Sequence, residues 1–142
     1  MHLFNLRVYG ILINEQKEVL VTDEFRFGKE MTKFPGGGLI WGEGTIDCLK
    51  REFKEELNCD IEIVKHFYTT DFFQESAFHK DHQLISIYYL VKTKNESPLP
   101  TSPVRGGEMI RWISLSKINS NHFTFTIDKK VAEMLKDYSK SG

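Results

Sequence analysis

Apolar side chains recur at helical spacing in the segment 44–57. Ile46, Leu49, Phe53 and Leu57 follow one another at steps of three, four and four residues. At roughly 100° per residue these positions form one narrow stripe along a helix. The pattern predicts an amphipathic helix that packs this stripe on the protein core.

Apolar and partly alternating runs elsewhere in the chain predict β-strands. These runs cover residues 6–13, 18–21, 60–73, 83–91 and 109–113. The first two flank a polar break at residues 14–17, and we expect them to pair as a hairpin. Residues 22–34 show no sustained alternation, so we expect them to form a loop.

The end of the chain predicts a second helix over residues 127–138. Its apolar positions fall at helical spacing, at Ile127, Val131, Met134, Leu135 and Tyr138. Thr126 is a suitable N-cap, and Asp128 is favourable in the first turn because the N-terminal end of a helix attracts negative charge. We expect this helix to serve packing.

The order of these elements predicts one α/β domain. A hairpin, a glycine-rich turn, a helix, three further strands and a last helix suit a sheet sandwiched between helices. The chain has 142 residues, of which 40% are hydrophobic and 27% charged, which is enough to bury a substantial core. No internal repeat or domain boundary is visible, so we expect residues 1–142 to form a single domain.

The charged residues of the first helix are separated by sign. Glu52, Glu55 and Glu56 occupy an arc of roughly 100° beside the apolar stripe. The basic residues are assigned to the opposite flank, Lys50, Arg51 and Lys54. Like charges at i,i+4 cost about 0.2 to 0.5 kcal/mol, and the C-terminal end of the helix dipole adds to the repulsion. A bound divalent cation would remove that cost; the alternative is a solvated acidic face with Arg51 paired to Glu55.

A glycine-rich turn precedes this helix. Pro35 is followed by Gly36, Gly37 and Gly38, and Glu43 comes shortly before the helix. Glycine allows positive φ and close backbone approach, so main-chain groups can face a metal ion or a pyrophosphate without obstruction by side chains. The turn therefore favours a binding site at the start of the helix.

The spacing of these residues resembles the Nudix box at residues 37–59. Gly37 is followed after five residues by Glu43, and after seven more by the run Arg-Glu-Phe-Lys-Glu-Glu at 51–56. The match departs at Asn58, where the family prefers glycine, and at Cys59, where it prefers an aliphatic residue. Both substitutions preserve the geometry, because Asn tolerates a left-handed conformation and Cys packs as a small apolar residue.

The resemblance implies an α/β/α sandwich with a mixed β-sheet and a set of site residues. Glu52 and Glu56 would be the principal Mg²⁺ ligands, with Mn²⁺ as a substitute. Glu55 would be a ligand or the proton acceptor, and the Gly36 carbonyl a further ligand. The catalytic group is then Glu55, Arg51 and Glu52, in which Arg51 orients a glutamate. Glu43 and Gly37 would support the site.

Residues outside the box are needed to complete such a site. The family often adds a further carboxylate from a loop, and the two candidates are Glu75 and Glu108. Aromatic and cationic side chains near the glycine turn could contact the substrate, because nucleobases stack on aromatic rings and guanidinium groups bind phosphate. These candidates are Phe25, Arg26, Phe27 and Trp41. Each of the aromatic residues could instead serve packing.

The reaction that the resemblance implies is Mg²⁺-dependent hydrolysis of a phosphoanhydride. The substrate would be a nucleoside diphosphate linked to another moiety, of the ADP-ribose or nucleotide-sugar type. One alternative is a pyrophosphohydrolase of oxidised nucleoside triphosphates. Another is a non-catalytic nucleotide-sensing domain, whose usual sign would be loss of the box glutamates. A third is a partner-binding domain, which would not depend on divalent ions.

Composition narrows the partners and the location. The net charge of −1 and the pI near 6.5 give no basic footprint for polymeric nucleic acid or an anionic membrane. The longest apolar run is too short to span a membrane. Cys48 and Cys59 lie too far apart along the helix for a disulfide, at roughly 16 Å. We therefore expect a cytoplasmic protein that acts on a small nucleotide. The proline-rich segment 95–107 suits a lid, a homodimer contact or a flexible excursion.

Overall fold

The computed structural model describes residues 1–26, 28–95, 97–102 and 107–140 of the chain. It has two α-helices, α1 (Thr45–Leu57) and α2 (Thr126–Lys140), and a short 3₁₀ helix, η2 (Ser120–His122). The strands are β1 (Leu3–Leu12), β2 (Glu18–Arg26), β3 (Lys29–Lys33), β4 (Gly36–Gly38), β5 (Ile61–Thr69), β6 (His82–Thr93) and β7 (Met109–Ser114).

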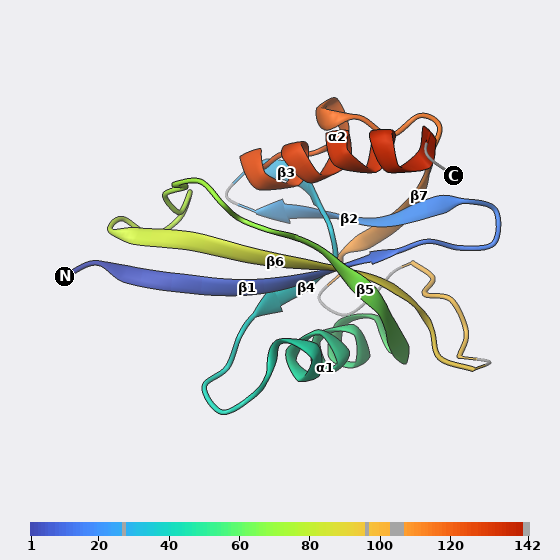
Figure 1. The fold of residues 1–142 in the computed structure, drawn as a ribbon, viewed down its shortest axis with the longest axis horizontal. Coiled ribbons are helices and arrows are strands. Elements are labelled where there is room, and N and C mark those ends of the chain that lie inside the picture. The colour runs from blue at the N-terminus through green and yellow to red at the C-terminus, as the bar shows by residue number, and fades with distance from the viewer. Residues whose placement is uncertain (27, 96, 103–106, 141–142) are drawn as a thin grey trace.

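The strands form two sheets. One has four strands in the order β4-β1-β6-β5, in which β1 and β6 run parallel and the other neighbours run antiparallel. The other sheet is antiparallel and has the order β3-β2-β7. Figure 1 shows α1 below the strands and α2 above them, so that β1 and β6 lie between two helical layers. The expected α/β architecture with a mixed sheet and flanking helices is confirmed.

The pairing expected at the start of the chain is wrong. β1 and β2 follow one another closely but belong to different sheets, and only one bridge, between Ile13 and Val19, joins this part of the chain. The loop expected at residues 22–34 is also wrong, because β2 continues to Arg26 and pairs with β3. Residues 22–34 show little alternation of polar and apolar side chains, because charged side chains stand at positions where a buried strand would have apolar ones. The sequence pattern therefore did not indicate these strands.

Two apolar clusters hold the helices against the strands. The cluster under α1 contains Leu49, Phe53 and Leu57 from the helix, as the periodicity predicted. Ile46 is the exception, because its side chain is 41% exposed and buried Cys48 takes its place. The cluster under α2 joins that helix to both sheets, through Ile127, Val131, Ala132 and Leu135.

The C-terminal end of α1 has the geometry expected from its sequence. Asn58 caps the helix in the left-handed conformation with φ 49°, and its N–H donates to the carbonyl of Lys54. The N–H of Cys59 donates to the carbonyl of Phe53, which satisfies a further helix-end acceptor. Cys59 is fully buried, and both cysteines are free. The two substitutions in the box therefore preserve its fold.

The last helix differs slightly from its prediction. It begins at Thr126 itself, so Thr126 lies within the first turn instead of capping it. Asp128 lies in the first turn as expected, and it is buried. In the described part of the chain, no helix has the length and apolar character needed to cross a membrane. Part of the segment 95–107, namely residues 96 and 103–106, lies outside the described residues.

Candidate active site

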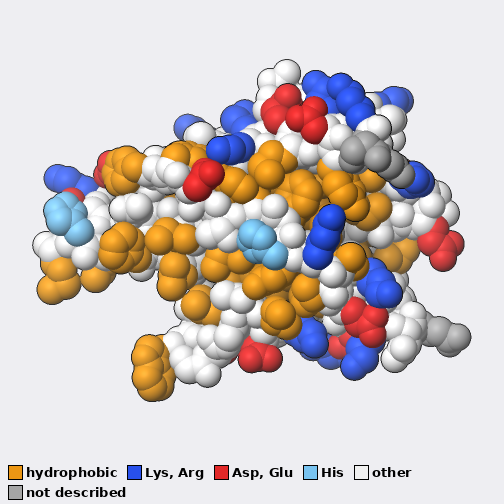
Figure 2. All heavy atoms as spheres, in the orientation of Figure 1, with side chains coloured by type: hydrophobic (Ala, Val, Ile, Leu, Met, Phe, Trp, Pro, Cys, Tyr) orange, Lys and Arg blue, Asp and Glu red, His pale blue; other side chains and the backbone are white. Residues whose placement is uncertain are grey.

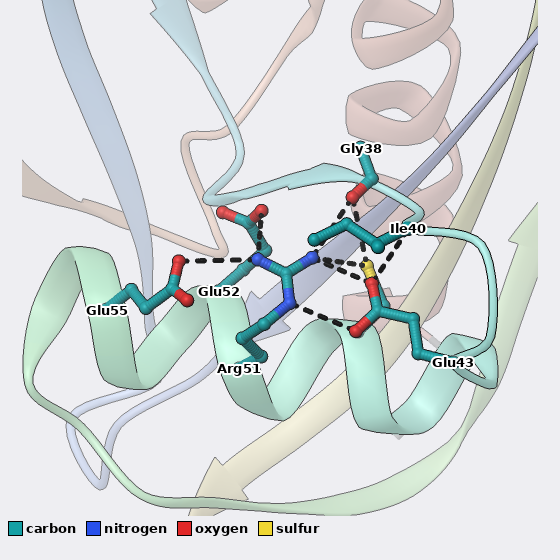
Figure 3. A network of polar contacts seen from close by, with 7 residues as sticks. Gly38, Ile40, Glu43, Arg51, Glu52 and Glu55 are labelled. Carbon is teal, nitrogen blue, oxygen red and sulfur yellow. Dashed lines mark hydrogen bonds and ion pairs between the residues drawn. The ribbon is translucent and has the colours of Figure 1, made fainter.

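Arg51 joins the charged residues of the box into one network. Its Nη2 and Nε donate to the two carboxylate oxygens of Glu43, at 2.7 and 3.0 Å. Its Nη1 lies 3.0 Å from Glu52 Oε1 and 3.3 Å from Glu55 Oε2. Nη2 also donates to the carbonyl of Gly38 at 3.2 Å. Figure 3 shows the guanidinium surrounded by these groups, so the helix and the preceding turn are fixed to each other.

This network corrects one detail of the helix pattern. Arg51 was assigned to the flank opposite the glutamates, but its side chain reaches across to Glu52 and Glu55. The Arg51–Glu55 pair of the solvated-face alternative is present, although it is only one of three carboxylate contacts. Hydrogen bonds from Arg51 lower the pKa of Glu43 to about 2, and those with Glu43 raise the pKa of Arg51. These groups stay ionised across the physiological range.

The glycines before the helix allow the backbone to approach the carboxylates. A Cβ on Gly37 would lie 2.5 Å from the carboxylate carbon of Glu52, so only glycine leaves room for that side chain. Gly36 has φ +152°, and a Cβ there would lie 2.1 Å from the carbonyl oxygen of Val8. Both positions therefore require glycine, one for the carboxylate and the other for strand pairing.

A second group of charges lies at the ends of β2, β3 and β7. Lys33 Nζ is 3.3 Å from Glu24 Oε1 and 4.0 Å from Glu108 Oε1. Burial, the neighbouring carboxyl of Glu24 and, to a smaller extent, the charge of Glu56 together raise the pKa of Glu108 to about 7. The charge of Glu56 on α1 contributes to this shift, so the two carboxyl groups lie within electrostatic range of each other. One of the two expected extra carboxylates is therefore near α1.

Glu75, the other candidate for the extra carboxylate, lies in a different setting. It is exposed in the segment between β5 and β6, and it forms an isolated bridge with Gln83 at the start of β6. Its role and that of Glu108 both stay predictions.

The donors near α1 fit a hard divalent cation. The side chains of Glu52, Glu56 and Glu108 offer only carboxylate oxygens, and Gly37 leaves open space for the first of them. Among the described residues, no three His, Cys, Asp or Glu side chains converge closely enough to hold a metal alone. Mg²⁺ usually binds through one or two carboxylates, with waters and substrate phosphates completing its shell. An open site of this kind is compatible with the arrangement.

A cleft of about 740 Å³ opens on the α2 side of the four-stranded sheet. Its walls come from β1, β6, the β2–β3 hairpin, the segment 74–79 and the start of α2. This volume is in the range of small-molecule sites. The charged residues that line it are Arg7, Glu24, Arg26, Lys29, Lys33, Glu75 and Asp128.

The expected substrate-contacting residues are only partly brought to this cleft. Arg26 lines it, with its guanidinium 5.2 Å from the ring centre of Phe78. Phe25 is 75% exposed and Trp41 is 98% exposed, and neither is among the residues that line the cleft. Phe27 lies outside the described residues. A substrate role for these four residues stays a prediction.

Several residues of the cleft were not identified from the sequence. Arg7 Nε donates to Tyr9 Oη at 2.6 Å, and Tyr88 Oη donates to Asp128 Oδ1 at 2.5 Å. Burial raises the pKa of Asp128 to about 7. Two signals could have found them. Arg7 interrupts an apolar run, and Asp128 lies on the buried stripe of its helix, where an acidic residue is unusual.

Fold and site together define a domain of the Nudix class, because a glycine strand leads into a helix of clustered carboxylates that packs on a mixed sheet. The sequence matches the NUDIX domain family over residues 3–136. The chain therefore belongs to the Nudix hydrolase family, a family of pyrophosphohydrolases. The resemblance of residues 37–59 to the family's box is confirmed.

Individual relatives are more distant. An RNA pyrophosphohydrolase of Orientia tsutsugamushi (strain Boryong) is 30% identical over 61 residues, which cover 43% of this chain and 38% of that protein. A MutT protein of Methanosarcina mazei Go1 superposes with a TM-score of 0.72 at 19% identity, over 98% of this chain and 97% of that one. An ADP-ribose pyrophosphatase of Streptococcus suis gives 0.60 at 18% identity, over 93% and 87%. These two structures show that the fold is shared.

Proposed function

We propose that this protein hydrolyses the phosphoanhydride bond of a nucleoside diphosphate linked to another moiety, of the ADP-ribose or nucleotide-sugar type, with Mg²⁺ or Mn²⁺. The observation that carries the proposal is the assembled box: Arg51 links Glu43, Glu52 and Glu55, and Glu52 lies against a glycine that leaves it room. An eroded site in a sensing domain would lack these contacts. Residues 1–142 would act as one such domain.

The roles follow the box residue by residue. Glu52 and Glu56 would hold the divalent ions, with the Gly36 carbonyl as a further ligand and Glu55 as a ligand or the proton acceptor. Arg51 would orient Glu52 and Glu55, because it contacts both carboxylates. Glu43 would support the site, since it accepts two hydrogen bonds from Arg51 and one from the N–H of Ile40.

The chain's own groups would supply orientation and charge. Divalent ions would neutralise the diphosphate oxygens and make a water more acidic. Arg51 holds its partners in fixed positions before the substrate arrives, which reduces the reorganisation needed during reaction. Glu108 is the better-placed extra carboxylate, because its pKa responds to Glu56. With a pKa of about 7 before any cation binds, its carboxyl can accept a proton near neutral pH.

The cleft would hold the nucleoside part of the substrate. It offers aromatic surface at Phe78 and cations at Arg7, Arg26 and Lys33. Figure 2 shows acidic and basic side chains interspersed on the visible face, above and below a band of hydrophobic and other side chains. This mixed surface, with the net charge of −1, favours a small nucleotide over a long polyanion.

Two other substrates have some support from relatives. MutT proteins share the fold, which keeps an oxidised nucleoside triphosphate as an alternative. The match to an RNA pyrophosphohydrolase covers less than half of either chain, so RNA ends belong in the same test. A homodimer and a cytoplasmic location stay predictions from the sequence.

A substrate screen tests the proposal. ADP-ribose, a nucleotide sugar, an oxidised deoxynucleoside triphosphate and a triphosphate-ended RNA oligomer would each be incubated with Mg²⁺ or Mn²⁺. Phosphate released after coupling to a phosphatase measures turnover of the diphosphate compounds, and chromatography identifies the products of the others. We expect the highest kcat/KM for a diphosphate compound. A preference for the triphosphate or for RNA would replace the diphosphate compound as the proposed substrate. Turnover without a divalent ion, or no turnover at all, would contradict the proposal that the protein is a metal-dependent hydrolase.

A further inference from the structure

Arg7 is a partly buried cation on the wall of the cleft. Its Nε donates to Tyr9 Oη, and its guanidinium carbon lies 5.7 Å from the centre of that ring. Within the part of the chain that the structure describes, Arg7 takes part in no ion pair within 4.0 Å, whereas Arg26, Arg51 and Arg111 each do. Its one hydrogen-bond partner among these residues is the phenol.

None of the acidic or phenolic groups that the structure describes around Arg7 forms an ion pair with its guanidinium. Burial raises the pKa of Tyr9, so the phenol is neutral at physiological pH. Glu52 is already in contact with Arg51 at 3.0 Å. Asp128 receives the hydrogen bond of Tyr88, and its carboxyl is partly protonated near pH 7. A charge removed from water is normally paired, so this position suits a ligand anion as a further partner of Arg7.

The glycine strand β4 separates Arg7 from the box carboxylates. Arg7 lies opposite Gly38 in the β1–β4 ladder, and a Cβ on Gly38 would be 3.5 Å from Arg7 Nη1. A Cβ on the neighbouring Gly37 would point to Glu52 instead. Successive residues of a strand face opposite sides, so Arg7 and Glu52 lie on the two sides of a strand that has no side chains. Arg7 therefore lies on the cleft side of β4, and the box carboxylates lie on the other side.

We propose that Arg7 binds the phosphoryl group attached to the nucleoside and so fixes the register of the substrate. The nucleoside then occupies the cleft, and the second phosphoryl group lies at the glutamates of α1. A guanidinium suits this task because its fork of donors matches phosphate oxygens. The assignment rests on the proposed function, and it adds the orientation of the substrate and a residue that selects for a phosphoryl group.

Binding of AMP and of adenosine tests this assignment without any turnover. Calorimetry in Mg²⁺ would compare the wild type with Arg7→Gln, Arg7→Lys and the control Lys92→Gln. Lys92 is exposed and lies outside the cleft, so its variant removes one positive charge elsewhere. We expect Arg7→Gln to weaken AMP about 10- to 100-fold and to leave adenosine within about 2-fold. Arg7→Lys should recover part of the loss, and Lys92→Gln should change neither.

The possible outcomes distinguish loss of phosphate binding by Arg7 from a general structural effect of the substitution. Equal weakening of AMP and adenosine by Arg7→Gln would overturn the assignment, and so would unchanged AMP binding. Wild-type protein that binds AMP no more tightly than adenosine would overturn it as well. Thermal unfolding of each variant checks that the fold is intact. A protein that binds AMP through Arg7 but hydrolyses nothing in the screen would keep this assignment and lose the proposed function.

Discussion

Helices α1 and α2 both pack an apolar stripe against strands, but they hold their acidic residues in opposite ways. At α1, Arg51 binds three carboxylates and lowers the pKa of Glu43 to about 2. At α2, Asp128 is buried beside Tyr88, and burial raises its pKa to about 7. The first arrangement keeps the Glu43 carboxylate ionised, and the second favours the neutral acid at Asp128.

The difference shows why amphipathic pattern alone does not identify a functional helix. Carboxylates that are held in place by an arginine side chain can bind a divalent ion. A carboxyl that is buried against a phenol has lost most of that capacity and serves as a hydrogen-bonding group. The surroundings of each acid, more than its place on the helix, decide its chemistry. Four sets of variants and one binding measurement test this contrast.

Glu56→Gln should have the largest effect. It preserves shape but removes one negative charge from the proposed metal site, so kcat/KM should fall by about two orders of magnitude or more with the fold intact. The matched control is Glu133→Gln on the exposed face of α2, which should leave turnover unchanged. Steady-state kinetics of both variants with Mg²⁺ measures the difference. Undiminished activity of Glu56→Gln would remove the assignment.

Asp128→Asn should change the pH dependence of stability. An unfolded Asp titrates near pH 4, whereas the folded carboxyl holds its proton up to about pH 7. Between these values the folded state binds more protons, so the free energy of unfolding falls as pH rises and levels off above about 7. The loss should be about 4 kcal/mol, and Asp128→Asn should abolish it. Urea unfolding from pH 4 to 8 measures it; equal slopes in both proteins would contradict the buried neutral acid.

Gly37→Ala and Gly38→Ala form a matched pair on one strand. The methyl group at position 37 would collide with the Glu52 carboxylate, whereas the one at 38 has ordinary contact with Arg7. We expect Gly37→Ala to lower kcat/KM about 10- to 30-fold by displacing a ligand, a cost of about 1.4 to 2 kcal/mol. Gly38→Ala should stay within a few-fold. Similar losses in both variants would mean that loss of strand flexibility, not displacement of Glu52, causes the effect.

Glu108→Gln and Glu75→Gln should give the smallest and most discriminating difference. Glu108 lies in the field of Glu56 and beside Lys33, whereas Glu75 is exposed. We expect about a 10-fold loss of kcat for Glu108→Gln and less than about 2-fold for Glu75→Gln, the lower end of what general acid–base or electrostatic groups contribute. The reverse order would assign the extra carboxylate to Glu75.

Much of this site could be predicted because its determinants are local. Helix α1, its left-handed end at Asn58 and the glycine turn depend on residues close together in sequence. The spacing from Gly37 to Glu56 was therefore enough to indicate the family and to predict a metal site. The position of Arg51 was only half predicted, because its contact with Glu43 depends on the path of the turn.

The cleft could not be predicted, because it is built from distant segments. Arg7, Tyr88 and Asp128 come from β1, β6 and α2, and they meet only when β1 and β6 pair in parallel. The same cause explains the errors at the start of the chain, where β1 and β2 enter different sheets. Short-range alternation does not specify which sheet a strand joins.

Binding of Mn²⁺, followed by electron paramagnetic resonance, tests the central contrast most directly. The wild type, Asp128→Asn and the double variant Glu52→Gln/Glu56→Gln would be titrated under the same conditions. If the carboxylates of α1 hold the cation, the wild type and Asp128→Asn bind Mn²⁺ alike and the double variant loses that binding. Equal Mn²⁺ binding by the double variant and the wild type would contradict the account.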